Sequence, residues 1–175
     1  MRLLAAIAVL ILVAPSVALA QSGEYPRRLP APGGEVIISG PGGQRAHDEV
    51  GYAPARRAGD TLYVSGAIVF RAPDEGSDVV AFEAQVRRTL THLNRTLAAA
   101  GATMNDVALI NSFHVWEGPD FAGTKDQQIE IIARVWRELS DGPRPAWSAV
   151  GTPGLLGQGG VVEIQLTVHS PARVR

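Results

Sequence analysis

Apolar and polar residues alternate most clearly near the end of the chain, over residues 161–169. Four aliphatic side chains (Val162, Ile164, Leu166 and Val168) alternate there with four polar ones (Glu163, Gln165, Thr167 and His169). This pattern predicts a strand with one buried face and one polar face. Glu163 is then a carboxylate on the polar face, where it is either solvated or part of a site.

Shorter strands are predicted earlier in the chain, at 35–39, 52–58, 61–66 and 107–116. The dipeptide Gly59-Asp60 separates two of them, so 52–58 and 61–66 are expected to form a hairpin. Residues 144–150 read as one further strand.

Two segments have helical periodicity. In 78–100, apolar residues recur every three or four positions, Ser77 or Asp78 can cap the start, and Gly101 can end the helix. The sequence Thr124-Lys125-Asp126-Gln127 is a capping box that opens a second helix. His114 is expected to pack within the fold or lie at its surface rather than bind a metal.

This order of elements predicts an α+β fold in which two helices cover one face of a mixed sheet. The other face carries polar residues together with some apolar ones. A partly apolar sheet face without a cover is a candidate for subunit contact, so we expect an oligomer.

The N-terminal residues have the features of an export signal. Arg2 precedes an apolar run, and Ala18-Leu19-Ala20 is a cleavage signal, so 1–20 is predicted to be a signal peptide. An uncleaved membrane anchor is the alternative. Residues 21–34 are rich in Pro and Gly and are predicted to be a flexible tether, and 35–175 to be a single domain. The mature protein is expected in the periplasm or outside the cell, with no membrane contact after cleavage.

The composition of the chain excludes several kinds of catalytic and binding site. The chain has no cysteine, which excludes thiolate catalysis, disulfides and cysteine metal ligands. Its 16 Lys and Arg residues nearly balance 17 Asp and Glu residues, so no basic surface for nucleic acid is indicated. The four histidines lack metal-ligand spacing. The glycine-rich loop 151–160 precedes a strand and lacks the Lys-Ser/Thr of a phosphate-binding loop.

Two small residues end the strand 61–66. Ser65 and Gly66 would allow a ligand to approach the backbone. A plain turn explains the same pair equally well.

Taken together, several motifs resemble the Rid family (reactive intermediate deaminase, also YjgF/YER057c/UK114). They lie, in the family's order and spacing, at 52–66, 93–102, 106–107, 120–121, 143–150 and 162–164. The resemblance implies a chorismate-mutase-like fold, a homotrimer, and small-molecule ligand clefts between subunits. It also implies hydrolysis of 2-imino or 2-enamino acids to 2-oxo acids and ammonia, with no metal or organic cofactor.

Site residues follow from the matching motif positions. The resemblance implies that Glu163 orients the attacking water. It implies a substrate-binding cleft that involves Tyr52, Ser65, Gly66, Trp147 and Ser148.

One of these positions departs from the family pattern. The family's deaminases have an arginine, which pairs with the substrate carboxylate, at the place of Trp147. A bidentate Arg–carboxylate pair contributes roughly 1.5–3 kcal/mol, whereas an indole offers one N–H donor and no charge. Trp147 either fills the cleft or forms an aromatic wall for a different ligand.

Two functions therefore remain open. The first is a Rid-type hydrolase with an altered substrate, which the retained Glu163 favours. The second is a non-catalytic trimeric binding or holdase-like module, which Trp147 favours.

Overall fold

The computed structural model describes residues 24–171. The predicted signal peptide and the first three residues of the predicted tether lie outside this range. The strands are β1 (Arg27–Ala31), β2 (Gly34–Ile38), β3 (Ala55–Ala58), β4 (Thr61–Phe70), β5 (Val107–His114), β6 (Ala146–Gly151) and β7 (Gly160–His169). The helices are α1 (Pro41–Arg45), α2 (Val79–Ala99) and α3 (Lys125–Leu139), with short turns η1 (Ala46–Val50) and η2 (Met104–Asp106).

All seven strands form one mixed sheet, in the order β1-β2-β3-β4-β7-β5-β6. Neighbouring strands are antiparallel except β5 and β6, which run parallel. The C-terminal strand β7 therefore lies inside the sheet, between β4 and β5.

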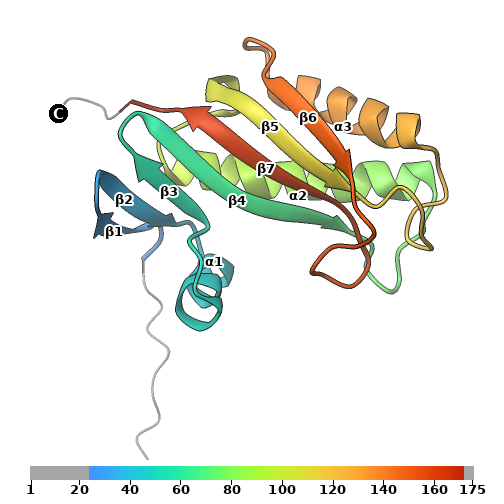
Figure 1. Ribbon diagram of the computed structural model, residues 1–175, viewed down its shortest axis with the longest axis horizontal. Coiled ribbons are helices and arrows are strands. Elements are labelled where there is room, and N and C mark those ends of the chain that lie inside the picture. The colour runs from blue at the N-terminus through green and yellow to red at the C-terminus, as the bar shows by residue number, and fades with distance from the viewer. Residues whose placement is uncertain (1–23, 172–175) are drawn as a thin grey trace, which may run out of the picture.

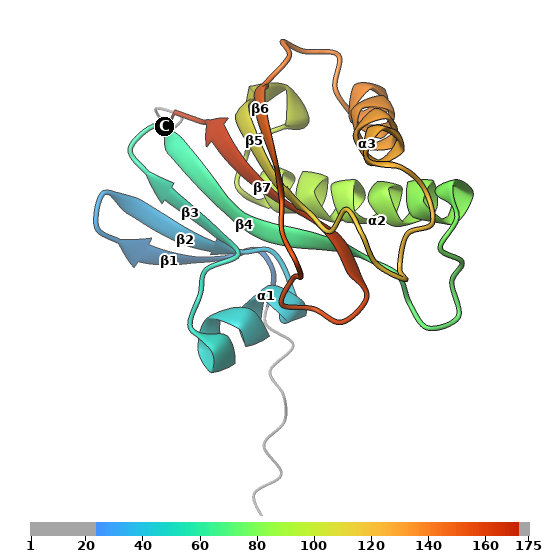
Figure 2. The same cartoon turned by 45° about the vertical axis from the view of Figure 1, so that its right-hand side comes forward.

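The long helices α2 and α3 lie side by side on one face of this sheet (Figure 1). Figure 2 shows the opposite face without a helical cover and the short α1 apart from the other two helices. The core lies between helices and sheet, and its largest buried side chains include Phe82, Leu90, Ile164 and Leu166. The predicted α+β fold is confirmed, with α1 as an additional short helix.

The predicted helix ends are confirmed because local sequence determines them. The carboxylate of Asp78 accepts hydrogen bonds from the backbone N–H groups of Val80 and Ala81, which caps α2. Gly101 follows the helix with a φ of 76°. At the start of α3, Thr124 and Gln127 form the reciprocal bonds of a capping box.

The predicted tether is wrong over its second half. Residues 27–31 form β1, which pairs with β2 through a two-residue turn at Pro32-Gly33. An ion pair between Arg28 and Glu35 also joins the two strands. β1 is one of the two edge strands of the sheet. Pro30 is accommodated there although it cannot donate a hydrogen bond to a neighbouring strand.

Two strands differ in detail from their prediction. β4 extends four residues beyond Gly66, to Phe70, and its pairing with β7 is irregular between Val64 and Ala67. β5 ends at His114, two residues before its predicted end. Its pairing with β7 is irregular after Val107, so that Ile110, Ser112 and His114 face the helices. No helix within residues 24–171 is long and apolar enough to cross a membrane.

Candidate functional site

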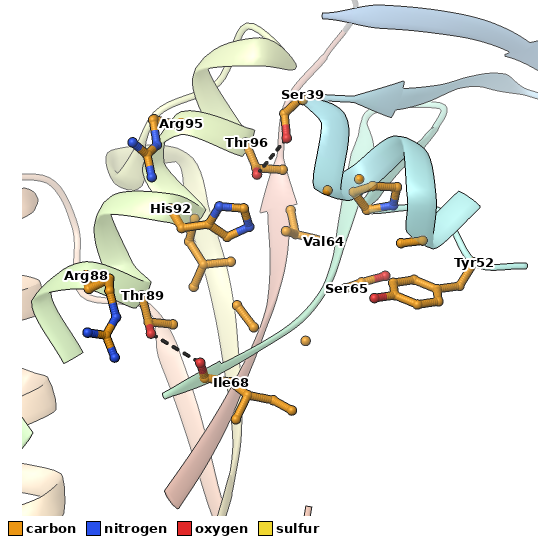
Figure 3. A pocket seen from close by; sticks show the side chains of 18 of the residues that line it. Ser39, Tyr52, Val64, Ser65, Ile68, Arg88, Thr89, His92, Arg95 and Thr96 are labelled. Atoms are coloured by element: carbon orange, nitrogen blue, oxygen red, sulfur yellow. Dashed lines mark hydrogen bonds between the residues drawn. The ribbon is translucent and has the colours of Figure 1, made fainter. Parts of the chain in front are cut away.

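A cavity of about 650 Å³ lies between α2, β4 and the segment that contains α1. Tyr52, Ser65 and Gly66, three of the predicted site residues, line it. Figure 3 shows side chains of α2 on one side of the cavity, with Tyr52 and Ser65 on the other. The structure thus brings together the front half of the predicted site.

Ser65 lies in the irregular part of β4, where hydrogen bonds fix its position. Its hydroxyl donates to the carbonyl oxygen of Ala53 at 2.6 Å. Its backbone N–H donates to the carbonyl oxygen of Pro54 at 3.0 Å. Because its proton is already donated, the Ser65 hydroxyl shapes the cavity wall rather than serving as a nucleophile.

Glu163 lies over Gly66. A Cβ built on Gly66 would come within 1.8 Å of Oε1 of Glu163, so only glycine leaves room for this carboxylate. Glu163 is half-buried on the face of the sheet away from α2 and α3, in register with Ile68 of β4. Within residues 24–171 its carboxylate makes no hydrogen bond or ion pair, which leaves its oxygens able to accept from a ligand or water.

Ser148 and Trp147 lie on β6, at the far edge of the sheet. Ser148 is in register with Asn111, which is in register with Gln165 of β7, so it shares the open face with Glu163. Trp147 is in register with the buried Ile110 and points to the helix-covered face. Within this chain, therefore, neither β6 residue reaches the cavity beside Gly66.

Trp147 starts a chain of hydrogen bonds that runs into the core. Its indole N–H donates to Oγ of Ser112 at 2.8 Å, and this Oγ lies 2.7 Å from Nε2 of His114. Nδ1 of His114 lies 3.0 Å from Oε1 of Gln128, whose Nε2 donates to the carbonyl oxygen of Val115 at 3.2 Å.

These contacts assign the tautomer of His114. Since Oε1 of Gln128 can only accept, Nδ1 of His114 carries the proton, and Nε2 accepts from the Ser112 hydroxyl. Burial lowers the pKa of His114, although the bond to Gln128 opposes this shift. His114 is therefore a neutral structural residue, as the sequence favoured, and its ring stacks on Trp116 with centroids 4.2 Å apart.

Sequence reasoning missed the contribution of α2 to the cavity. Arg88, His92 and Arg95 line it together with Thr89 and Thr96. Arg88 and Arg95 lie outside the apolar positions of the helix, and both are exposed. Their spacing along one side of the helix was the available signal, but only the position of α1 opposite shows that they border a cavity.

The two arginines differ in their surroundings. Arg88 forms an ion pair with Glu75 at 2.5 Å and donates to the carbonyl oxygen of Phe70 at 2.8 Å. The bond from Arg88, with one from the backbone of Ala72, lowers the pKa of Glu75 to about 2. Arg95 has no such partner within residues 24–171.

The remaining cavities and side-chain clusters were compared with what a second ligand site or a metal site would need. A second cavity of about 240 Å³ lies between the loops 115–121 and 153–161. In residues 24–171, no group of three His, Asp or Glu side chains is placed to hold a metal ion.

Comparison with known proteins identifies the family. The model of the endoribonuclease L-PSP family matches residues 42–170. The chain belongs to this family, which includes the YjgF, RutC and Rid proteins. Its matched region starts within α1 and ends after β7, and so contains every predicted site residue.

Individual relatives agree with this assignment. The RutC family protein YjgH of Escherichia coli strain K12 is 38% identical over 107 residues, which cover 61% of this chain and 74% of YjgH. The solved structure of YjgH has a TM-score of 0.55 at 34% identity, covering 73% of this chain and 89% of that one. A YjgF/YER057c/UK114 family member from Mycobacterium tuberculosis has a TM-score of 0.54 at 25% identity, with coverages of 71% and 92%. The resemblance to the Rid family is confirmed.

Proposed function

We propose that this protein hydrolyses the C=N bond of a small imine or enamine-derived imine and releases ammonia. The observation that carries the proposal is the position of Glu163, whose half-buried carboxylate lies over the backbone of Gly66 without a protein partner in the described residues. A carboxylate placed in this way can accept a proton from water next to a bound ligand.

The chemistry needs water, a proton acceptor and a positioned substrate. Water attacks the imine carbon while one of its protons passes to Glu163, and the substrate nitrogen takes up a proton. The nitrogen of the resulting carbinolamine takes up the proton held by Glu163 and leaves as ammonia, while the hydroxyl proton passes to solvent as the carbonyl forms. The net change is one imine and one water to one carbonyl compound and one ammonia. Ser65 and Gly66 shape the backbone surface on which the substrate lies.

The test is a single-residue exchange of the proposed proton acceptor. Imines generated in situ from several amino acids and amines are offered to the protein, and ammonia release is measured. Glu163→Gln should lower the rate by about 100-fold or more, because the amide cannot accept the proton. Glu130→Gln, which changes an exposed carboxylate on α3, is the matched control. Equal rates for wild type and Glu163→Gln would refute the proposed role.

A non-catalytic binding module is the second candidate. The favouring observation is that Trp147, at the position where the resemblance implies an arginine, donates its only N–H group to Ser112. The site at 147 then offers an aromatic surface and no charge. Binding of small ligands by a folded protein that releases no ammonia from any imine would support this function over hydrolysis.

The proposed function also involves a homotrimer. Tyr63, Phe113 and Val150 are exposed on the open face of the sheet, with 52%, 37% and 52% of their surface accessible. We propose that this face forms the contacts of a homotrimer, whose subunits together would complete the cleft.

We also propose export to the periplasm or beyond, which mass measurement of the secreted protein can test.

A further inference from the structure

The α2 wall gives the cavity a positive charge that no acidic side chain balances inside it. Arg88, His92 and Arg95 line the cavity, and no Asp or Glu is among its lining residues in the described chain. Outside the cavity, Glu75 pairs with Arg88, so most of the uncompensated charge comes from Arg95.

His92 adds a hydrogen-bond donor to the cavity beside Arg95. His92 lies one helical turn before Arg95 and Thr96, and Figure 3 shows its ring directed into the space between α2 and α1. Although the residue as a whole is exposed, partial desolvation of its ring, together with the charge of Arg95, lowers the pKa of His92. It is therefore neutral at pH 7 and can donate one N–H to a ligand.

Hydrogen bonds hold the α2 wall against both neighbouring elements. Oγ1 of Thr89 donates to the carbonyl oxygen of Ile68 in β4 at 3.3 Å. Two turns further along, Oγ1 of Thr96 lies 3.2 Å from Oγ of Ser39, which follows β2. These two contacts fix the helix relative to the cavity floor, so the positions of His92 and Arg95 between them are set before any ligand arrives.

We propose that Arg95 and His92 form an anion subsite, which binds the oxyanion group of a small organic ligand whose apolar part lies along β4. Val64, Ala67 and Leu93 supply the apolar surface beside this end. The subsite offers a cation in the same cavity as Ser65 and Gly66, whereas Trp147 offers none. That the ligand is a substrate rests on the proposed function, but anion binding itself does not need turnover.

Binding of matched probes to the full chain tests the subsite. Butanoate and butyl phosphate carry the two common oxyanion groups, and butanamide is a neutral molecule with the shape of butanoate. We expect at least one anion to bind about tenfold tighter than butanamide in a calorimetric or NMR titration, which is the effect of one charge-assisted hydrogen bond. Comparison of the two anions then identifies the preferred oxyanion group.

Single substitutions test whether Arg95 and His92 are responsible for the anion affinity. Arg95→Gln should lower anion affinity about tenfold, and His92→Gln should lower it by a smaller factor. Arg137→Gln, which removes an exposed arginine from α3 outside the cavity, should leave the affinity within about twofold. Circular dichroism confirms folding of each variant.

Three results would overturn the subsite: no anion binding by folded wild type, equal binding of butanamide and both anions, or unchanged anion affinity in folded Arg95→Gln. Ammonia release separates the two proposals. Turnover that needs Glu163, in a protein whose anion affinity is unchanged by Arg95→Gln, refutes the subsite and retains the hydrolase. Arg95-dependent anion binding without turnover of any imine retains the subsite and refutes the hydrolase.

Discussion

The carboxylate of Glu163 occupies the space that a side chain at Gly66 would need, with Oε1 only 1.8 Å from the position of a Cβ. We therefore expect Gly66→Ala to displace Glu163 and to lower the free energy of unfolding by about 1–3 kcal/mol, as for other overpacked sites. Imine hydrolysis should fall with it. Chemical denaturation and ammonia release measure the two effects.

A second substitution separates crowding from a general effect of alanine. The stability lost in Gly66→Ala should largely return in the double variant Gly66→Ala/Glu163→Ala, whereas activity should not. Gly154→Ala is the control, because a Cβ there meets no atom within 4 Å. If Gly66→Ala is as stable and active as wild type, Glu163 does not lie over Gly66 in solution.

Trp147→Arg tests whether position 147, where the resemblance implies an arginine, faces a ligand in the proposed trimer. Trp147 is half-buried on the edge strand β6, from which a long arginine can extend. We expect Trp147→Arg to increase hydrolysis of imines that carry a carboxylate, and Glu163→Gln to abolish the gain. Loss of the ring and of its bond to Ser112 should cost about 1–3 kcal/mol of stability.

The control for this experiment is Trp147→Leu, which removes the ring without adding charge. Steady-state kinetics on imines with and without a carboxylate measure the gain. A folded Trp147→Arg protein no more active than Trp147→Leu would show that position 147 does not contact the substrate.

Burial of neutral His114 predicts a loss of stability on mild acidification. Its folded pKa lies below the unfolded value of about 6.5, so the unfolded chain binds the proton more readily. The resulting stability is fully present above about pH 6.5 and is lost as pH falls from there toward the folded pKa. Protonation would also remove the acceptor that the Ser112 hydroxyl needs. Thermal melts from pH 7.5 to 5 should show a falling Tm.

Substitution of His114 tests whether this residue causes the pH dependence of stability. His114→Gln should lower the free energy of unfolding by about 1–3 kcal/mol at pH 7.5, yet reduce the further loss toward pH 5. The pKa of His92 is lowered too, so His92→Gln shows how much of the slope is not due to His114. The lowered pKa of Glu75 acts only in more acidic solution, below about pH 4.5. An unchanged slope in His114→Gln would contradict this account.

Tyr63 tests the proposed trimer. It is 52% exposed on the open face of β4, and a charge buried there in an interface costs several kcal/mol. Tyr63→Asp should convert the trimer to monomers, as measured by light scattering coupled to size exclusion. Val80→Asp places the same charge on an exposed apolar position of α2 and should leave the mass unchanged. A monomeric wild type, or a trimeric Tyr63→Asp, would exclude this face as the interface.

The parts of the fold that depend on local pattern were predictable from the sequence. The ends of α2 followed from Asp78 and Gly101, and the two faces of β7 from its alternation. β1 was not predictable in this way, because Pro30 suits both a tether and an edge strand, and only pairing with β2 decides between them. The helix-facing side of β5 also depended on an irregularity that the sequence does not mark.

The candidate site was predictable only in part. The family motifs pointed to Ser65, Gly66 and Glu163. The structure places the carboxylate of Glu163 over Gly66, but Glu163 is not among the residues that line the cavity with Ser65 and Gly66. The motifs could not show that Trp147 lies on the opposite face from Glu163, which follows from the register of β6. Nor could they show the role of Arg95, because a polar residue on a helix reads as solvated until the facing segment is known.

The place of β7 in the sheet also sets when the fold can be completed. During synthesis, β1–β4 and β5–β6 are made first, but they share no hydrogen-bonded strand until residues 160–169 enter between β4 and β5. A ribosome stalled before Gly160 would hold two incomplete sheets with unpaired edges, which are prone to aggregate. Cooperative folding of the domain must therefore wait for β7, and the pairing of this last strand with β4 and β5 is its closing step.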